Sequence, residues 1–221
     1  EQPNLVSNWL PETVLLGNYQ RPSTDYLLDF ESDLDLVNDQ HVSINASNFL
    51  VWREETLTMR DGGNQGTNAV ILGWDADSLG TPTYELILKD SILLSDVESL
   101  TFSIGRTDAS DLKLEGDEPI DFSVSLVSDQ DTMTLPTLST VIKPAPLLKV
   151  KYMKLKQMNG SFGDEWELNM ETAAIPLQIP QEKEVWLKKL QFVFDQSTKG
   201  IIALDNIGLR KTIRSEEKQP D

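Results

Sequence analysis

Hydrophobic and polar residues alternate along much of this chain with a period of two residues. The alternation is clearest at 120–126, where Ile, Phe, Val and Leu are separated by Asp and Ser, and it recurs at 84–88 and 100–104. Successive side chains of a β-strand point to opposite faces, so this period predicts strands with one buried face.

Short apolar runs bounded by turn residues predict further strands. A helical period is weak, and only 90–100 and 181–188 are compatible with a short helix. We therefore predict an all-β, antiparallel two-sheet sandwich with less than about 15% helix, well below the usual share in globular domains. The predicted strands number about ten, at 27–31, 48–59, 69–74, 84–88, 100–104, 120–126, 147–155, 166–170, 190–194 and 201–209.

No internal repeat or change in composition divides the chain, so one domain is predicted. Residues 1–25 mix proline, glycine and polar residues and are expected to form an irregular lead-in or linker. The sandwich is expected over 26–211, followed by a charged tail over 212–221. The chain begins at Glu1 without a signal-like apolar stretch, which is typical of a mature protein or of a domain excised from a longer one.

Two carboxylates lie inside or directly beside apolar runs that are expected to be buried strands. Asp205 interrupts 200–209, and Glu31 follows the first strand, close to Asp29. Burying a bare carboxylate is costly, and one shared cation would compensate both groups. Ca²⁺, which takes six to eight oxygen ligands, suits carboxylates and loop carbonyls near Asp29. The alternative is that Glu31 and Asp205 face solvent or pair with a basic side chain.

The composition restricts the partners. There are 36 Asp and Glu against 19 Lys and Arg, which gives a formal net charge of −17. Such a surface repels phosphate backbones, so nucleic acid is not expected as a partner. No segment has the roughly 20 consecutive apolar residues of a membrane helix, so membrane insertion is not expected either. The absence of cysteine excludes disulfides and thiolate chemistry.

Aromatic residues are the candidates for contact with a ligand. Sugar rings stack their apolar C–H faces on exposed aromatic side chains. Of the five tryptophans, Trp52 and Trp74 have charged neighbours and lie near predicted strand ends. Arg106 closes a strand and is a candidate for a polar ligand contact. The alternatives are core packing for the tryptophans and an ion pair with Asp121 for Arg106.

Support for catalysis is thin. The single histidine, His41, lies in a polar stretch, and the sequence has no Gly-x-Ser-x-Gly motif and no histidine cluster for zinc. The many acids leave open a carboxylate pair of the kind that cleaves glycosidic bonds. We therefore expect a protein that is not an enzyme, with a β-sandwich lyase or glycosidase as the rival.

Several segments resemble the jelly-roll β-sandwiches of carbohydrate-binding modules and similar galactose-binding-like domains of secreted bacterial hydrolases. The resemblance spans roughly 26–211 and is most specific at its two ends. The segments that carry it are Asp-Phe-Glu at 29–31, Leu-Thr-Phe-Ser-Ile-Gly at 100–105, Pro-Ile-Asp-Phe-Ser-Val-Ser-Leu at 119–126, Ile-Pro-Leu at 175–177, Leu-Gln-Phe-Val-Phe-Asp at 190–195 and Gly-Ile-Ile-Ala-Leu-Asp-Asn-Ile at 200–207.

This resemblance implies a structural calcium bound by Glu31 and Asp205, although Asn206 replaces a second acid that is common in the family. It also implies a jelly-roll fold and a non-catalytic, carbohydrate-binding or accessory role. The expected partners are a polysaccharide or glycan and a catalytic domain in the same polypeptide. The expected location is extracellular, periplasmic or at the cell surface. The rival reading is a protein-docking domain without a sugar ligand, which an exposed apolar patch would indicate.

Overall fold

The computed structural model describes residues 24–30, 42–56, 68–107, 119–129, 131–144, 148–150, 165–167, 170–179 and 184–211. Nearly all of its regular structure is β-strand. Among the described residues, the helical elements are the four-residue α2 (Ala76–Leu79) and the short 3₁₀ turn η2 (Leu138–Thr140). The strands are β1 (Thr24–Leu28), β2 (Val42–Ser47), β3 (Val51–Thr56), β4 (Asn68–Asp75), β5 (Thr83–Leu93), β6 (Val97–Arg106), β7 (Ser123–Ser128), β8 (Thr132–Thr134), β9 (Leu148–Val150), β10 (Glu165–Glu167), β11 (Glu171–Pro176), β12 (Trp186–Val193) and β13 (Lys199–Lys211).

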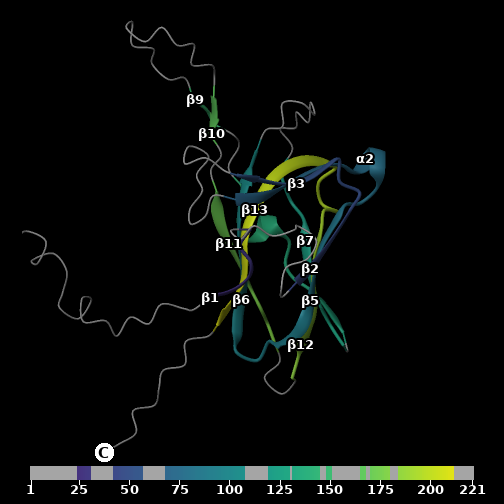
Figure 1. Cartoon of the computed structure of the whole chain (residues 1–221), viewed down its shortest axis with the longest axis vertical. Coiled ribbons are helices and arrows are strands. Elements are labelled where there is room, and N and C mark those ends of the chain that lie inside the picture. Colours follow the sequence, from purple (N-terminus) through teal and green to yellow (C-terminus); the bar gives the residue numbers. More distant parts are fainter. Residues whose placement is uncertain are drawn as a thin grey trace, which may run out of the picture.

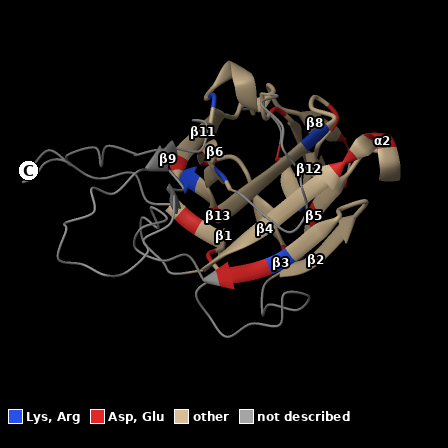
Figure 2. Ribbon diagram, turned by 90° about the horizontal axis from the view of Figure 1, so that it is seen from above, with Lys and Arg blue, Asp and Glu red and all other residues tan. Residues whose placement is uncertain are grey.

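The strands form two main antiparallel sheets that face each other (Figure 1). The large sheet has the order β11-β6-β13-β4-β3, with β1 paired to β13, and the small sheet has the order β2-β5-β12-β7-β8. Among the described strands, β9 and β10 pair with each other and with no other strand. This arrangement confirms the predicted all-β, antiparallel two-sheet sandwich. In Figure 2 most of the ribbon of both sheets is tan, and the charged residues form only short red (Asp, Glu) or blue (Lys, Arg) segments.

The core lies between the sheets and is rich in aromatic side chains. Phe102 of the large sheet meets Phe122 and Phe192 of the opposite layer, with ring centroids 6.0 and 5.5 Å apart. Phe194 packs on Trp74 at 4.6 Å. Truncating one such ring to alanine typically costs about 3–5 kcal/mol. These contacts join the two layers into one core.

The large sheet also carries a smaller buried apolar cluster, made of Ala69, Ile71, Met170, Ile201 and Ala203. Four of these alternate with core residues along β4 and β13, so they lie on the outer face of the sheet. Both faces of β4 are therefore buried, which explains why its sequence reads as a nearly continuous apolar run.

The two segments that were compatible with a short helix are not helical in the part of the chain that the structure describes. Within 90–100, β5 continues to Leu93, and β6 begins at Val97 after a tight turn closed by Val97 N–H donating to Leu94 O. Within 181–188, Trp186 begins β12. β2, which was not predicted, pairs with β5 at one edge of the small sheet. In the described segments, no helix has the length and apolar character needed to cross a membrane.

β13 organises the large sheet because it pairs with three strands. One side pairs along its length with β6. On the other side, Lys199–Leu204 pairs with β4 and Ile207–Arg210 pairs with β1. Between these halves, β13 carries one extra residue relative to β6, a β-bulge around Asn206, whose φ of 52° is in the left-handed region. The first and last described strands are therefore neighbours at this bulge.

Candidate functional site

Of the predicted calcium ligands, Asp205 lies at the bulge of β13 and Asp29 directly follows β1. Leu28 at the end of β1 is opposite Ile207, so in an antiparallel pair the residues after Leu28 run towards Asn206 and Asp205. Asp29 is half-buried. Glu31, the next predicted ligand, lies outside the described residues. The register thus brings the end of β1 close to Asp205, and the calcium site itself stays a prediction.

Asp205 is buried, with 3% of its surface exposed. Its Oδ1 accepts a hydrogen bond from the backbone N–H of Asn206 at 2.6 Å, and its Oδ2 accepts one from Asn206 Nδ2 at 2.7 Å. These bonds compensate part of the cost of burial. The oxygen chemistry suits Ca²⁺, but the described residues alone contain no group of three His, Cys, Asp or Glu that could hold a metal ion.

Trp74 was predicted as a platform for a sugar ring, and the structure contradicts this. Its side chain has no exposed surface, and its Nε1 donates to the backbone oxygen of Ser197 at 3.1 Å. It fills the end of the core against Phe194 and Gly200. The physical reason is that β4 is covered on both faces, so a tryptophan in this strand has no open side.

Trp52 and Arg106 are half-buried and lie apart in the large sheet. Trp52 is on the edge strand β3, packs against the core, and has a buried Nε1 without a hydrogen-bond partner. Arg106 ends β6 opposite Ile202. Asp121 was the suggested ion-pair partner of Arg106. Its Oδ1 accepts hydrogen bonds from the backbone N–H groups of Phe122 and Ser139, and these bonds stabilise a loop. The sheet order separates Trp52 from Arg106 by β4 and β13, so the two do not form one site.

A different site lies on the outer face of the large sheet. It is a groove of about 340 Å³ across β11, β6, β13 and β1. Its lining is polar and mostly hydroxyl-bearing, and we call it the hydroxyl groove. The lining residues are Thr24, Tyr26, Thr101, Ser103, Thr172, Asn206 and Arg210.

The floor of the hydroxyl groove follows from the alternation of β6. Leu100, Phe102 and Ile104 enter the core, so Thr101 and Ser103 face outward. Both are short, which leaves space above the sheet between longer neighbours. Thr101 Oγ1 donates to the backbone oxygen of Gly208 at 3.3 Å and so fixes the floor to β13.

One wall of the hydroxyl groove is β1, and Gly208 allows it to come close. A Cβ atom at position 208 would lie 2.9 Å from the backbone oxygen of Asp25 and 3.2 Å from Cα of Tyr26. The Tyr26 side chain stands on this wall with 48% of its surface exposed. An exposed aromatic ring beside hydroxyl groups is the combination that a sugar needs.

Arg210 occupies one end of the hydroxyl groove. Its Nε is buried and has no hydrogen-bond partner, and neither has Oγ of Ser99, which is opposite it on β6. The adjacent Lys211 faces away and pairs with Asp25, whose hydrogen bond raises the pKa of the lysine. Sequence reasoning missed this site because its residues come from four distant segments. The available signal was the row of small polar residues on β6.

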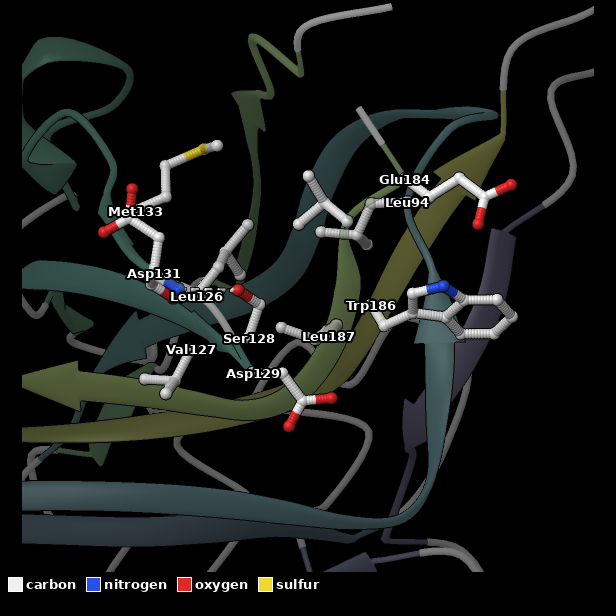
Figure 3. A pocket seen from close by; sticks show the side chains of 11 residues that line it. Leu94, Leu126, Val127, Ser128, Asp129, Asp131, Met133, Glu184, Trp186 and Leu187 are labelled. Carbon is white, nitrogen blue, oxygen red and sulfur yellow. Dashed lines mark hydrogen bonds between the residues drawn. The ribbon is translucent and has the colours of Figure 1, made fainter. Parts of the chain in front are cut away.

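A second pocket, of about 290 Å³, lies at one end of the small sheet (Figure 3). Leu94, Leu126 and Leu187 line it together with the acids Asp129, Asp131 and Glu184. Met133 and Asp131 lie on one side of the pocket in Figure 3, and Glu184, Leu94 and Trp186 lie on the other. Trp186 is 42% exposed. We call this the Trp186 pocket; it is apolar at its base and acidic around it.

Comparison with known proteins identifies the fold. No family model matches the sequence, and no curated protein matches it. Part of an exo-β-agarase structure matches 86% of this chain with a TM-score of 0.53 and 12% identity. This chain spans only 25% of the length of that agarase.

Carbohydrate-binding modules are also among the similar structures. A family 30 module has a TM-score of 0.47 and 14% identity, covering 86% of this chain and 94% of the module. The family 11 module of a cellulosomal cellulase from Clostridium thermocellum has a TM-score of 0.44 and 12% identity, covering 90% of this chain and all of the module. The fold itself is the antiparallel two-sheet β-sandwich that the sequence predicted.

Proposed function

We propose that this chain is a non-catalytic carbohydrate-binding domain that holds a glycan in the hydroxyl groove. The observation that carries the proposal is the exposed Tyr26 ring beside a floor and walls of threonine, serine and asparagine side chains. The aromatic face would stack on a sugar ring, and the hydroxyl and amide groups would hydrogen-bond to sugar hydroxyls. The groove is polar, so much of the interaction energy offsets displaced water and lost ligand freedom, and weak binding is expected.

The test is affinity electrophoresis and a glycan array with the wild-type protein and two variants. Tyr26→Ala should abolish most of the retardation by a bound polysaccharide, because the stacking surface is lost. Trp186→Ala is the matched control, since it removes an exposed aromatic residue from the other pocket. Equal binding by wild-type and Tyr26→Ala protein would contradict the assignment of the site. Release of reducing ends or unsaturated products would instead favour the lyase or glycosidase.

We also propose that a structural Ca²⁺ joins β1 to β13 through Asp205, Glu31 and the backbone or side chain of Asp29. The support is the buried carboxylate and the register that brings the end of β1 to it. Calcium should raise the melting temperature of the wild-type protein and leave that of Asp205→Ala and Glu31→Ala unchanged. A wild-type melting curve that chelation does not move would exclude the site.

A location outside the cytoplasm and attachment to a catalytic domain of a hydrolase complete the proposal. The exo-β-agarase supports the second point, because the part similar to this chain is a quarter of that polypeptide. The rival function is docking on a neighbouring protein domain. The Trp186 pocket favours it, since an exposed tryptophan borders an apolar base. If the folded protein binds none of the glycans tested, this rival function is favoured.

A further inference from the structure

Arg210 is the one charged residue among those that line the hydroxyl groove. The other six lining side chains are hydroxyls, a phenol and an amide. The guanidinium carries a fixed positive charge and five N–H donors in a planar fork. Its Nε is shielded from solvent and has no acceptor. A buried donor without a partner is unfavourable, so an oxygen acceptor from a ligand would be favourable at this N–H group.

The state of Arg210 contrasts with that of other basic side chains. Within the described segments, no ion pair joins Arg210 to a carboxylate, although acids are in excess over the whole sequence. Five other basic residues of these segments are paired: Arg53 with Glu55, Lys188 with Asp129, Lys189 with Glu85, Lys199 with Asp75, and Lys211 with Asp25. Among the described residues, Arg210 is thus a cation in the groove that no carboxylate pair neutralises.

We infer that the hydroxyl groove selects an acidic sugar, whose anionic group pairs with the Arg210 guanidinium while the sugar ring lies against Tyr26. The inference rests on the proposed function and adds the class of ligand. A planar carboxylate or a sulfate ester accepts two parallel N–H bonds from guanidinium, and such charge-assisted bonds are about twice as strong as neutral ones. The neutral hydroxyls around the charge suit the remaining hydroxyls of the same sugar.

Because the protein is strongly acidic overall, the contact with Arg210 matters for binding an acidic sugar. A protein with a net charge of −17 repels polyanions over most of its surface. Binding of an acidic polysaccharide therefore requires a defined cationic position and cannot arise from a general basic surface. Arg210 supplies that position in a groove of suitable size and chemistry.

The experiment compares ligands that differ only in charge. Polygalacturonate and its fully methyl-esterified form share one backbone, and a sulfated galactan and its desulfated form share another. Wild-type protein should bind a charged member of one pair roughly tenfold or more tightly than its neutral counterpart, in line with a charge-assisted hydrogen bond. Preference within the first pair identifies a carboxylate, and preference within the second identifies a sulfate.

Variants assign the preference to Arg210. Arg210→Gln should lose the preference, and Arg210→Lys should keep part of it because the charge remains and the fork is lost. Lys211→Gln is the matched control: it changes the net charge equally at the adjacent position and should behave as wild type. Circular dichroism and melting curves establish that each variant is folded.

The two proposals fail in different ways. Equal binding of charged and neutral members, unchanged in Arg210→Gln but lost in Tyr26→Ala, would overturn the acidic-sugar inference and leave glycan binding in the groove intact. Absence of binding to every member of both pairs by folded wild-type protein would overturn both. A preference that persists in Arg210→Gln and disappears in Lys211→Gln would place the charge contact outside the groove.

Discussion

Glu85 is a nearly buried carboxylate on the outer face of the small sheet, with 12% of its side chain exposed. It accepts hydrogen bonds from Lys189 Nζ at 2.8 Å and from Asn45 Nδ2 at 2.9 Å. Burial by itself raises the pKa of Glu85, but the hydrogen bonds and the charge of Lys189 outweigh it, so the pKa is lowered from its ordinary value of 4.5. The network joins β2, β5 and β12.

The lowered pKa predicts a contribution of Glu85 to acid sensitivity. A carboxyl group with a depressed pKa in the folded state stabilises the protein above its unfolded pKa, and the stabilisation is lost as the pH falls through the folded pKa. The loss therefore begins near pH 4.5 and grows below it. Between pH 6 and pH 3, the melting temperature of Glu85→Gln should fall less than that of wild type.

Glu55→Gln serves as the control for this measurement. Glu55 pairs with Arg53 at 3.0 Å, but about half of each side chain is exposed, so solvent screens the pair. Its replacement should leave the acid sensitivity close to that of wild type. Identical pH profiles for wild type and Glu85→Gln would show that the network does not stabilise the fold.

The tryptophans show what residue patterns can and cannot establish. Trp74 and Trp186 both lie at strand ends beside charged residues, yet the first is fully buried and the second is 42% exposed. The difference depends on the covering of both faces of β4, which is a property of the folded chain. The local sequence placed Trp74 near a strand end and Trp186 in a segment compatible with a helix, and it could not assign the exposure of either.

At the scale of elements, β13 carries two glycines whose close contacts differ in kind. A Cβ at Gly200 would lie 2.5 Å from the Trp74 ring, in the core. A Cβ at Gly208 would lie 2.8 Å from Thr24 Cγ2 and 2.9 Å from the backbone oxygen of Asp25, against β1. An added methyl group therefore perturbs the core packing at position 200 and the packing of β1 on β13 at position 208.

We predict that Gly200→Ala and Gly208→Ala both destabilise the protein, by about 1–3 kcal/mol as is typical of overpacking. Only Gly208→Ala should also weaken glycan binding, since it displaces the wall that carries Tyr26. Denaturant unfolding gives the free energies, and affinity electrophoresis of the folded variants gives the binding. Wild-type affinity in Gly208→Ala would show that β1 is not part of the site.

Strand positions were largely predictable because one buried face imposes a period of two. The error at 90–100 has a physical origin. Apolar residues at 93, 94, 97 and 100 have helical spacing, but the chain turns at Leu94 and its two halves enter opposite sheets. The strands that each half pairs with, and not the local spacing of apolar residues, determined the structure of this segment. The same holds for the hydroxyl groove, which exists only where four distant segments become neighbours.

At the scale of the whole molecule, net charge and Arg210 act over different distances. The charge of −17 repels an acidic glycan at long range, whereas the guanidinium attracts its anionic group on contact. Salt at about 0.1 M limits electrostatic interactions to about 10 Å and so screens mainly the long-range repulsion.

This separation predicts faster association with an acidic glycan as salt rises from about 0.01 to 0.15 M, with little change for its neutral counterpart. Surface plasmon resonance or stopped-flow fluorescence would measure the rates with both members of a ligand pair. Slower association of the charged member over this range would mean that attraction dominates at long range, contrary to the charge distribution inferred from the sequence.

The pairing of β1 with β13 also sets the response of the domain to mechanical tension. Thr24 is opposite Arg210, so the outer ends of the two strands lie side by side. Pulling these ends apart acts along the hydrogen bonds of an antiparallel pair, which run perpendicular to the strands. The bonds then break one after another from the outer end, so Tyr26 separates from β13 before the core residues Leu27 and Leu28 do. In the proposed glycan site, tension on these ends would therefore remove the Tyr26 wall of the hydroxyl groove first.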